Sequence, residues 1–204
     1  MEIGKTLRVT TRKAWRAWLE KNHAKKKEIW LVYATKQSGK PRVAYSDAVE
    51  EALCFGWIDG IVKKIDTNHF VQRFSPRRSS RSQLSETNKE RVRRMIRAGL
   101  MTPAGMEKIR DRMNEAFVLP PDIVAALKRD PKTWKNFQRF PKWYQRVRVG
   151  WLDMSRHRPE IFQSRLRYFL KMTAQNKRYG QVNDSVIKER RSKAPLLDAL
   201  RRVQ

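Results

Sequence analysis

The stretch YSDAVEEALCFGWIDG, residues 45–60, decides the fold. After Ser46, three carboxylates lie within the first two turns of a helix, where they favour the positive end of its dipole. Val49, Ala52 and Leu53 follow the spacing of an inward apolar stripe. The pattern therefore predicts a helix that begins at Ser46 and ends near Phe55. The Trp-Ile-Asp-Gly sequence that closes the stretch predicts a turn into the next element.

Extended segments stand on both sides of this helix in the sequence. Residues 28–34 form a short β-rich run that predicts a buried strand, and residues 57–74 predict a hairpin around the turn-forming quartet 66–69. Upstream, Thr10 or Thr11 can cap a first helix. Beyond Ser85, apolar stripes interrupted at prolines predict helices only. The sequence thus predicts the α+β class, with a small antiparallel sheet in the N-terminal half packed against a mainly helical C-terminal half.

Length and composition favour one compact domain. The 204 residues are 40% hydrophobic and include seven tryptophans, enough to build a core. We expect residues 1–180 to form a single domain and the basic residues 181–204 to form a tail or a loosely docked helix. The longest apolar run, Ala52 to Ile58, is far shorter than the ~20 residues that a spanning helix needs, and the start of the chain lacks a secretory segment. The prediction is a cytoplasmic protein without a transmembrane segment.

Positive charge dominates the composition. Lysine and arginine number 47 against 20 aspartates and glutamates, which gives a formal net charge of +27. Long cationic side chains are rarely buried unpaired, so they should cover the surface and attract polyanions. A high charge can also serve solubility alone. We predict a nucleic acid or another polyanion as the partner, bound through phosphate contacts, while no pattern assigns an oligomeric state.

Four short motifs carry a resemblance to a known family. They are ALCFGWIDG at 52–60, PRR at 76–78, SETN at 85–88 and MTPAG at 101–105. Together they resemble the YdeI/OmpD-associated family of bacteriocin-protection proteins. The segments YQRVRVGWLDMSR at 144–156 and SRLRYFLKM at 164–172 are more loosely similar to the closing helices of that family. The family carries a tryptophan where this chain has Leu84. The resemblance implies a role in stress response or in tolerance of cationic antimicrobial peptides, without implying a defined activity.

A tryptophan, an aspartate and two arginines predict an anion pocket near the first two motifs. The arginines could fork onto phosphate or carboxylate groups, with Trp57 as a stacking face and Asp59 orienting one arginine. Alternatively, Trp57 belongs to the core and Asp59 closes a turn. Polar residues before the next helix could line the pocket or only cap that helix. The candidate set is Trp57, Asp59, Arg77, Arg78, Ser82, Ser85 and Asn88.

Cations recur at helical spacing in three places and form the candidate nucleic-acid surface. A row at i, i+4 and i+8 could follow a phosphate backbone, although most such rows are solvated helix faces. The candidates are Lys89, Arg93 and Arg97, then Arg146 and Arg148, and finally Arg167 and Lys171.

Catalytic and metal-binding motifs are missing from the sequence. Cys54 stands among apolar neighbours, which indicates a buried small hydrophobe with a raised pKa. The three histidines match no metal motif, and no glycine-rich phosphate loop is present. We therefore predict no catalytic residue, no metal and no cofactor, and favour a non-enzymatic protein. The alternatives are an enzyme or small-ligand binder with an anionic metabolite at the candidate pocket, and a tolerance factor as the resemblance implies.

Overall fold

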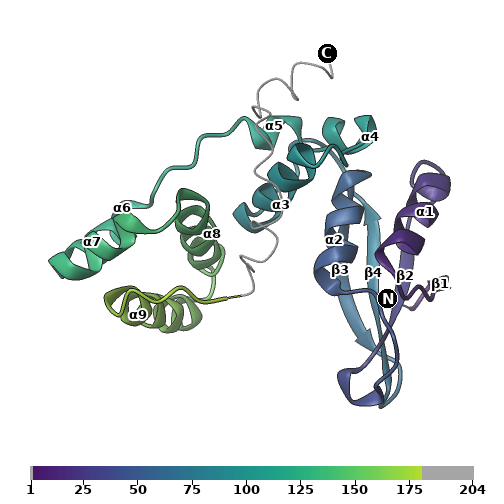
Figure 1. The fold of residues 1–204 in the computed structure, drawn as a ribbon, viewed down its shortest axis with the longest axis horizontal. Helices are drawn as coiled ribbons and strands as arrows, with labels where there is room; N and C mark the ends of the chain where they lie inside the picture. The colour runs from purple at the N-terminus through teal and green to yellow at the C-terminus, as the bar shows by residue number, and fades with distance from the viewer. Residues whose placement is uncertain (1, 181–204) are drawn as a thin grey trace. The chain divides into compact units, whose positions relative to one another are not determined.

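The computed structural model describes residues 2–180 of the chain (Figure 1). The predicted tail, 181–204, lies outside the described residues. The described chain divides into two compact units. The sheet unit comprises residues 2–83 and 91–114, and the helical unit comprises residues 84–90 and 115–180. The single domain expected over residues 1–180 stays a prediction.

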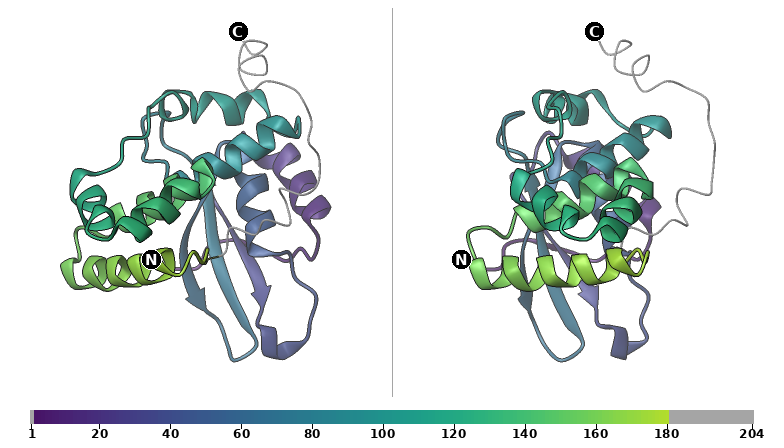
Figure 2. Two further views of the ribbon diagram at one scale, coloured as in Figure 1. Left: turned by 60° about the vertical axis from the view of Figure 1, so that its left-hand side comes forward. Right: turned by 90° about the vertical axis from the view of Figure 1, so that its left-hand side faces the viewer.

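The sheet unit contains a four-stranded sheet in the order β1-β2-β4-β3. The strands are β1 (Thr6–Leu7), β2 (Ile29–Ala34), β3 (Trp57–Lys64) and β4 (His69–Pro76). β3 and β4 form the expected hairpin, which Figure 2 shows from two directions. The α+β class is confirmed, but the sheet is mixed, because the two-residue β1 pairs parallel with β2. A β-bulge interrupts the β3–β4 ladder between Asp59 and Val62.

Two helices that pack against each other lie beside the sheet (Figure 1). They are α1 (Arg12–Asn22) and α2 (Tyr45–Cys54). Thr11 caps α1, as predicted, because its hydroxyl accepts a hydrogen bond of 3.2 Å from the Ala14 amide. Trp15 fills the space between these elements: its indole N–H donates to the Ala48 carbonyl, and its ring meets Phe74 of β4 edge-on.

Shorter helices complete the sheet unit. They are the 3₁₀ turn η1 (Lys36–Ser38), the greater part of α3 (Glu86–Arg97), α4 (Pro103–Glu107) and α5 (Arg110–Met113). Thr102 caps α4, because its hydroxyl accepts a hydrogen bond from the Gly105 amide, and Pro103 starts the helix. Gly105 allows α4 to touch the end of α2, because a Cβ atom at this position would overlap the Cys54 carbonyl oxygen.

A buried ion-pair network ties α1, α2 and α3 together within the sheet unit. Glu50 and Glu51 are only 3% and 2% exposed. Arg12 reaches both carboxylates, at 2.9 Å to Glu50 and 2.5 Å to Glu51. Arg16 adds a contact of 2.7 Å to Glu51, and Arg94 adds one of 3.0 Å to Glu50. Several of the chain's cations therefore neutralise internal carboxylates.

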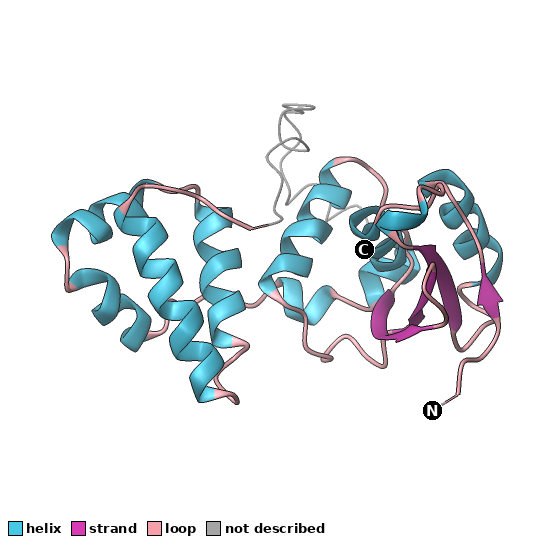
Figure 3. Cartoon of the chain, turned by 90° about the horizontal axis from the view of Figure 1, so that it is seen from below, coloured by secondary structure: helices cyan, strands magenta, loops and turns pink. Residues whose placement is uncertain are grey.

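The helical unit is built from helices alone (Figure 3). They are the first turn of α3, then α6 (Pro121–Lys128), α7 (Pro131–Arg139), α8 (Lys142–Asp153) and α9 (Pro159–Ala174). Their apolar stripes meet in one core, formed around Ile123, Leu127, Phe137, Leu152 and Phe169. Prolines stand in the first turn of α6, α7 and α9, where no hydrogen-bond donor is needed.

Candidate functional site

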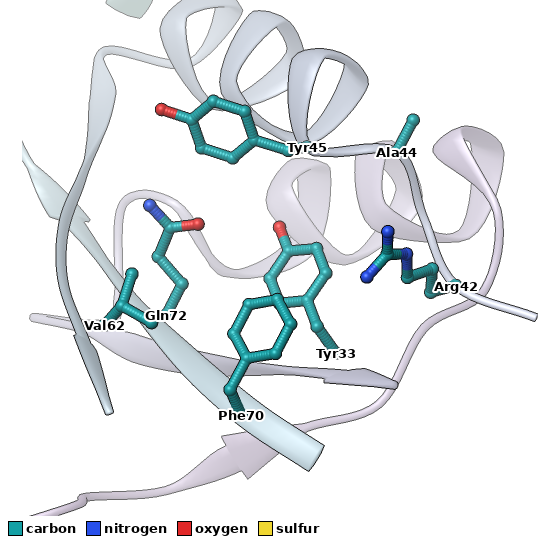
Figure 4. Close-up of a pocket in the computed structure, with 7 residues that line it drawn as sticks. All are labelled: Tyr33, Arg42, Ala44, Tyr45, Val62, Phe70 and Gln72. Carbon is teal, nitrogen blue, oxygen red and sulfur yellow. The ribbon is translucent and has the colours of Figure 1, made fainter. Parts of the chain in front are cut away.

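A pocket of about 530 Å³ opens in the sheet unit (Figure 4). Strands β2, β3 and β4 supply part of its lining, and the first residue of α2 and the segment before it supply the rest. The lining residues are Tyr33, Arg42, Ala44, Tyr45, Val62, Phe70 and Gln72. The volume lies in the range of roughly 300–1,000 Å³ that is usual for small-ligand sites.

Aromatic rings form the floor of the pocket. Tyr33 of β2 stands opposite Phe70 of β4 in the strand register, and their rings stack with centroids 5.1 Å apart and planes 6° from parallel. The Tyr45 ring lies across the cavity from this pair, and Val62 adds an aliphatic wall (Figure 4). A flat apolar group would find apolar surface on several sides here.

The hydroxyl group of Tyr33 is buried in the pocket without a partner. The residue is 1% exposed, and no described residue hydrogen-bonds its hydroxyl. In Figure 4 the hydroxyl points toward the space below Tyr45. Burial raises the pKa of this phenol, and the neighbouring Tyr45 and Asp59 raise it further, so it stays protonated. A buried hydroxyl without a partner costs about 1–3 kcal/mol, which a bound hydrogen-bond acceptor would remove.

Arg42 supplies positive charge at the rim. Its Nη1 donates a hydrogen bond of 2.8 Å to the carbonyl of Ala34. Among residues 2–180 no carboxylate forms an ion pair with it. The guanidinium also works against the rise of the Tyr33 pKa, so its charge reaches the phenol. The remaining N–H groups of Arg42 are therefore suited to bind an anion beside the Tyr33 hydroxyl.

Asp59 orients two side chains of the pocket without lining it. The Tyr45 hydroxyl donates a hydrogen bond of 2.7 Å to Oδ2 of Asp59, and Nε2 of Gln72 donates one of 3.0 Å to the same oxygen. Tyr45 is 44% exposed, and the partial burial of its ring raises its pKa to about 12, an effect to which the Asp59 carboxylate adds. Tyr45 is thus a neutral donor fixed in direction. Asp59, one of the candidate pocket residues named from the sequence, therefore contacts this pocket's lining.

Trp57 and the two candidate arginines lie elsewhere. Trp57 is 1% exposed, and its indole N–H donates 3.1 Å to the His23 carbonyl, so the structure places it in the core. Arg77 is buried as well, and its guanidinium donates to main-chain carbonyls at Ser82 (2.7 Å), Gln83 (3.1 Å) and Lys108 (3.4 Å). Arg78 is exposed. Arg77 thus holds the loop that follows β4.

The candidate serines and asparagine make local contacts. The Ser82 hydroxyl accepts a hydrogen bond of 3.2 Å from the Ser79 amide. The Ser85 hydroxyl accepts one of 3.2 Å from the Asn88 amide, which is the geometry of a helix cap at the start of α3. The hydrogen bond between Ser85 and Asn88 agrees with the alternative in which these residues only cap the helix.

The candidate nucleic-acid rows are only partly on the surface. Arg97, Arg167 and Lys171 are exposed, and Arg93 is half-buried. Lys89 is buried and pairs with Glu86 at 3.0 Å and Glu115 at 3.4 Å. Arg146 pairs with Glu90 at 3.5 Å, and Arg148 is buried among aromatic rings. Sequence spacing therefore identified cations of which several have internal partners.

The lining of the pocket was not foreseen from the sequence. One signal was available: Phe70, Gln72 and Phe74 alternate toward one face of a predicted strand, and a glutamine between two inward aromatics indicates a polar site. Nothing in the sequence joined this alternation to Tyr33 or Arg42, because the strand register and the segment before α2 bring them together.

Neither a metal cluster nor a membrane span is found in the described part of the chain. Residues 2–180 contain no group of three or more histidine, cysteine or carboxylate side chains that could hold a metal ion. Over the same residues no helix has the length and apolar character to cross a bilayer. Cys54 is buried, and burial raises its pKa to about 12, which agrees with the apolar role expected for it.

Comparisons with known proteins place the chain in a family. No curated protein and no solved structure matches it. Residues 116–176 match the family described as "Bacteriocin-protection, YdeI or OmpD-Associated", which confirms the predicted resemblance over α6 to α9. The motifs quoted for that resemblance between residues 52 and 105 lie instead within a second match, over residues 7–108, to the family described as "Domain of unknown function (DUF8412)". Because this second match spans 102 of the 204 residues, half of the chain, the protein belongs to the DUF8412 family, with a YdeI/OmpD-associated segment after it.

Proposed function

We propose that the sheet unit binds a small acidic ligand in the pocket between Tyr33, Arg42 and Tyr45. The single observation that carries this proposal is the Tyr33 hydroxyl, which is buried at a cavity of about 530 Å³ and has no partner among the described residues. A buried hydroxyl without a hydrogen-bond partner lowers the stability of a protein. At a cavity of this size, a bound ligand can supply the missing acceptor.

The chemistry of the lining defines the ligand class. Tyr33 and the guanidinium of Arg42 both offer hydrogen-bond donors, so the group between them must accept hydrogen bonds and carry negative charge. A carboxylate or a phosphate monoester meets both conditions. The stacked Tyr33–Phe70 pair and Val62 favour a flat apolar body attached to that group. The ligand is therefore a compact aromatic or cyclic acid.

The proposed pocket differs from the metabolite site predicted from the sequence but shares Asp59 with it as a neighbour. The sequence indicated a small-ligand binder with an anionic metabolite near Trp57, Asp59 and two arginines. Asp59 stays beside the pocket through its bonds to Tyr45 and Gln72. Arg42 takes the part that was expected of Arg77 and Arg78, since it is the arginine that lines the cavity.

The test compares acids with neutral analogues of the same shape. Benzoate, phenyl phosphate and cyclohexanecarboxylate would be titrated against the protein at constant ionic strength, with benzamide and benzyl alcohol as neutral controls. Thermal unfolding gives the readout, since a ligand at a hundred times its dissociation constant adds ~2.7 kcal/mol of stability. Saturable binding of at least one acid, with weaker binding of its neutral analogue, is the expected result.

Two variants locate the site. Arg42→Met removes the charge at the rim and should weaken the acid about tenfold or more, as expected for a hydrogen bond to a charged group. Arg78→Met removes an exposed arginine that does not line the pocket and should leave the affinity unchanged. Equal affinity of wild type and Arg42→Met for every acid, or no binding by any of them, would refute the proposal.

A second candidate function is the binding of a nucleic acid or another polyanion. The net charge of +27 favours it, together with exposed cations at Arg78, Arg97, Arg167 and Lys171. Phosphate contacts release counterions, so the logarithm of the affinity for duplex DNA should fall by about 0.9 per logarithmic unit of salt for each phosphate neutralised. Measurement of binding across a salt series decides the point, and affinity that does not change with salt would contradict it.

A further inference from the structure

Arg148 in the helical unit is a buried cation enclosed by aromatic rings. The residue is 7% exposed. Its Cζ atom lies 5.1 Å from the centroid of Tyr179, 5.6 Å from that of Trp151 and 5.8 Å from that of Tyr144. The main chain of Gly180 lies directly against the guanidinium, because a Cβ atom added there would overlap it. The side chain is therefore held in place by contacts with ring faces and backbone.

Among the described residues, the guanidinium of Arg148 lacks the carboxylate or carbonyl acceptors that Arg77 and Arg146 have. Over residues 2–180 no carboxylate pairs with it, and its buried Nε–H has no hydrogen-bond partner. By contrast, Arg77 donates to three main-chain carbonyls. The half-buried Arg146 of the same helix also has an Nε–H without a partner, but its Nη2 pairs with Glu90. A buried charge without an acceptor is costly, and ring faces replace only a part of the lost hydration.

A second polar group with an unused proton lies next to this cation. The hydroxyl of Tyr179 is buried, and among residues 2–180 no acceptor takes its proton. Burial raises the pKa of Tyr179 to about 12, while the positive charge of Arg148 and its hydrogen bonding to the phenol oxygen act in the opposite direction. The phenol is therefore protonated at neutral pH and offers a donor beside the guanidinium. The Tyr179 backbone amide is already used, since it donates 2.9 Å to the Tyr144 hydroxyl.

We propose that Arg148 and Tyr179 form an anion site for one small oxyanion group, either a carboxylate or a phosphate. Both polar groups are donors, so the ligand must be an acceptor, and the planar fork of a guanidinium matches two oxygens of such a group. The site is separate from the pocket of the sheet unit, because the two share no residue.

The test follows the Nε–Hε signal of Arg148 in ¹H–¹⁵N spectra of the full chain. Acetate and inorganic phosphate would be titrated separately, with chloride holding the ionic strength constant. A saturable shift of this signal with one or both anions is the expected result, and the two titrations distinguish a carboxylate site from a phosphate site. Absence of a saturable shift with both anions would overturn the proposal.

Variants show whether both donors take part. Tyr179→Phe removes only the hydroxyl and keeps the ring against Arg148, so it should weaken the anion by about tenfold. Lys135→Met removes an exposed charge of the same unit and should leave the affinity unchanged, which separates a built site from general attraction to a basic protein. Equal weakening by the two variants would mean that surface charge alone holds the anion, and would also overturn the proposal.

Discussion

Replacement of Tyr33 by phenylalanine should make the protein more stable and its pocket weaker. The substitution removes one oxygen atom and keeps the ring, so the stack with Phe70 at 5.1 Å is retained. Tyr33 is 1% exposed, and the hydroxyl that the substitution removes has no partner among residues 2–180. A buried polar group without a partner costs about 1–3 kcal/mol, and the variant is relieved of that cost.

The expected magnitude follows from this single atom. We expect the free energy of unfolding to rise by about 1 kcal/mol or more in the absence of ligand, which raises the melting temperature by about 2–4 °C per kcal/mol for a chain of this size. The affinity for the acidic ligand should fall by about tenfold, because one hydrogen bond to a charged group is lost.

The assay is denaturant unfolding of wild type and variant side by side. Tyr45→Phe is the matched control in the same pocket, because its hydroxyl donates to Asp59 at 2.7 Å. Loss of that bond should lower the free energy of unfolding by about 1 kcal/mol, so the two tyrosine variants should change stability in opposite directions. If Tyr33→Phe were destabilised as much as Tyr45→Phe, the Tyr33 hydroxyl would have an acceptor and the argument for a ligand would fail.

Three further outcomes are expected. Gly105→Ala should lose about 3 kcal/mol of stability in denaturant unfolding, because its Cβ atom would overlap the Cys54 carbonyl oxygen. A loss below about 1 kcal/mol would show that α4 can move aside. Cys54 should react with a thiol reagent only as fast as the protein unfolds, because burial raises its pKa to about 12; rapid labelling under native conditions would contradict this. Hydrogen bonding to Arg73 lowers the pKa of Glu28 below its ordinary 4.5, so its contribution to stability is complete above that value and is lost as the pH falls through the lower, folded pKa. Stability measured across this acid range should therefore decline less steeply in Glu28→Gln, and an unchanged slope would count against the assignment.

Local sequence patterns predicted helices and strands better than they predicted contacts between residues that are distant in the chain. Thr11 and Ser85 act as helix caps and the β3–β4 hairpin forms around its turn, because these features depend on residues close together in the chain. The parallel strand β1 was missed, since two residues are too few to show any period. The helix α2 begins at Tyr45, one residue before the predicted Ser46.

The functional groups were harder to predict because their surroundings come from distant segments. Spacing placed Lys89 and Arg148 in cationic rows, but spacing says nothing of the acids or rings that enclose a side chain. Trp57 was a candidate for stacking on a ligand, because its position in the sequence does not show whether another element covers it. In the structure Trp18 of α1 meets it edge-on, with the ring centroids 5.8 Å apart. Long-range pairing decides burial, and burial decides which charges can meet a ligand.

The bulge in β3 has a consequence for how the protein behaves at high concentration. β3 is an edge strand of the sheet. The aliphatic side chains of Ile61 and Val62 in β3, and of Ile65 directly after it, are exposed. A regular edge strand has main-chain N–H and C=O groups without partners, and a strand of another copy can pair with them. The irregular spacing between Asp59 and Val62, followed by the charge of Lys64, opposes such growth. Dissolved ions screen the charge of Lys64. At high salt concentration the β-bulge is therefore the main barrier to the pairing of edge strands that would build a fibre.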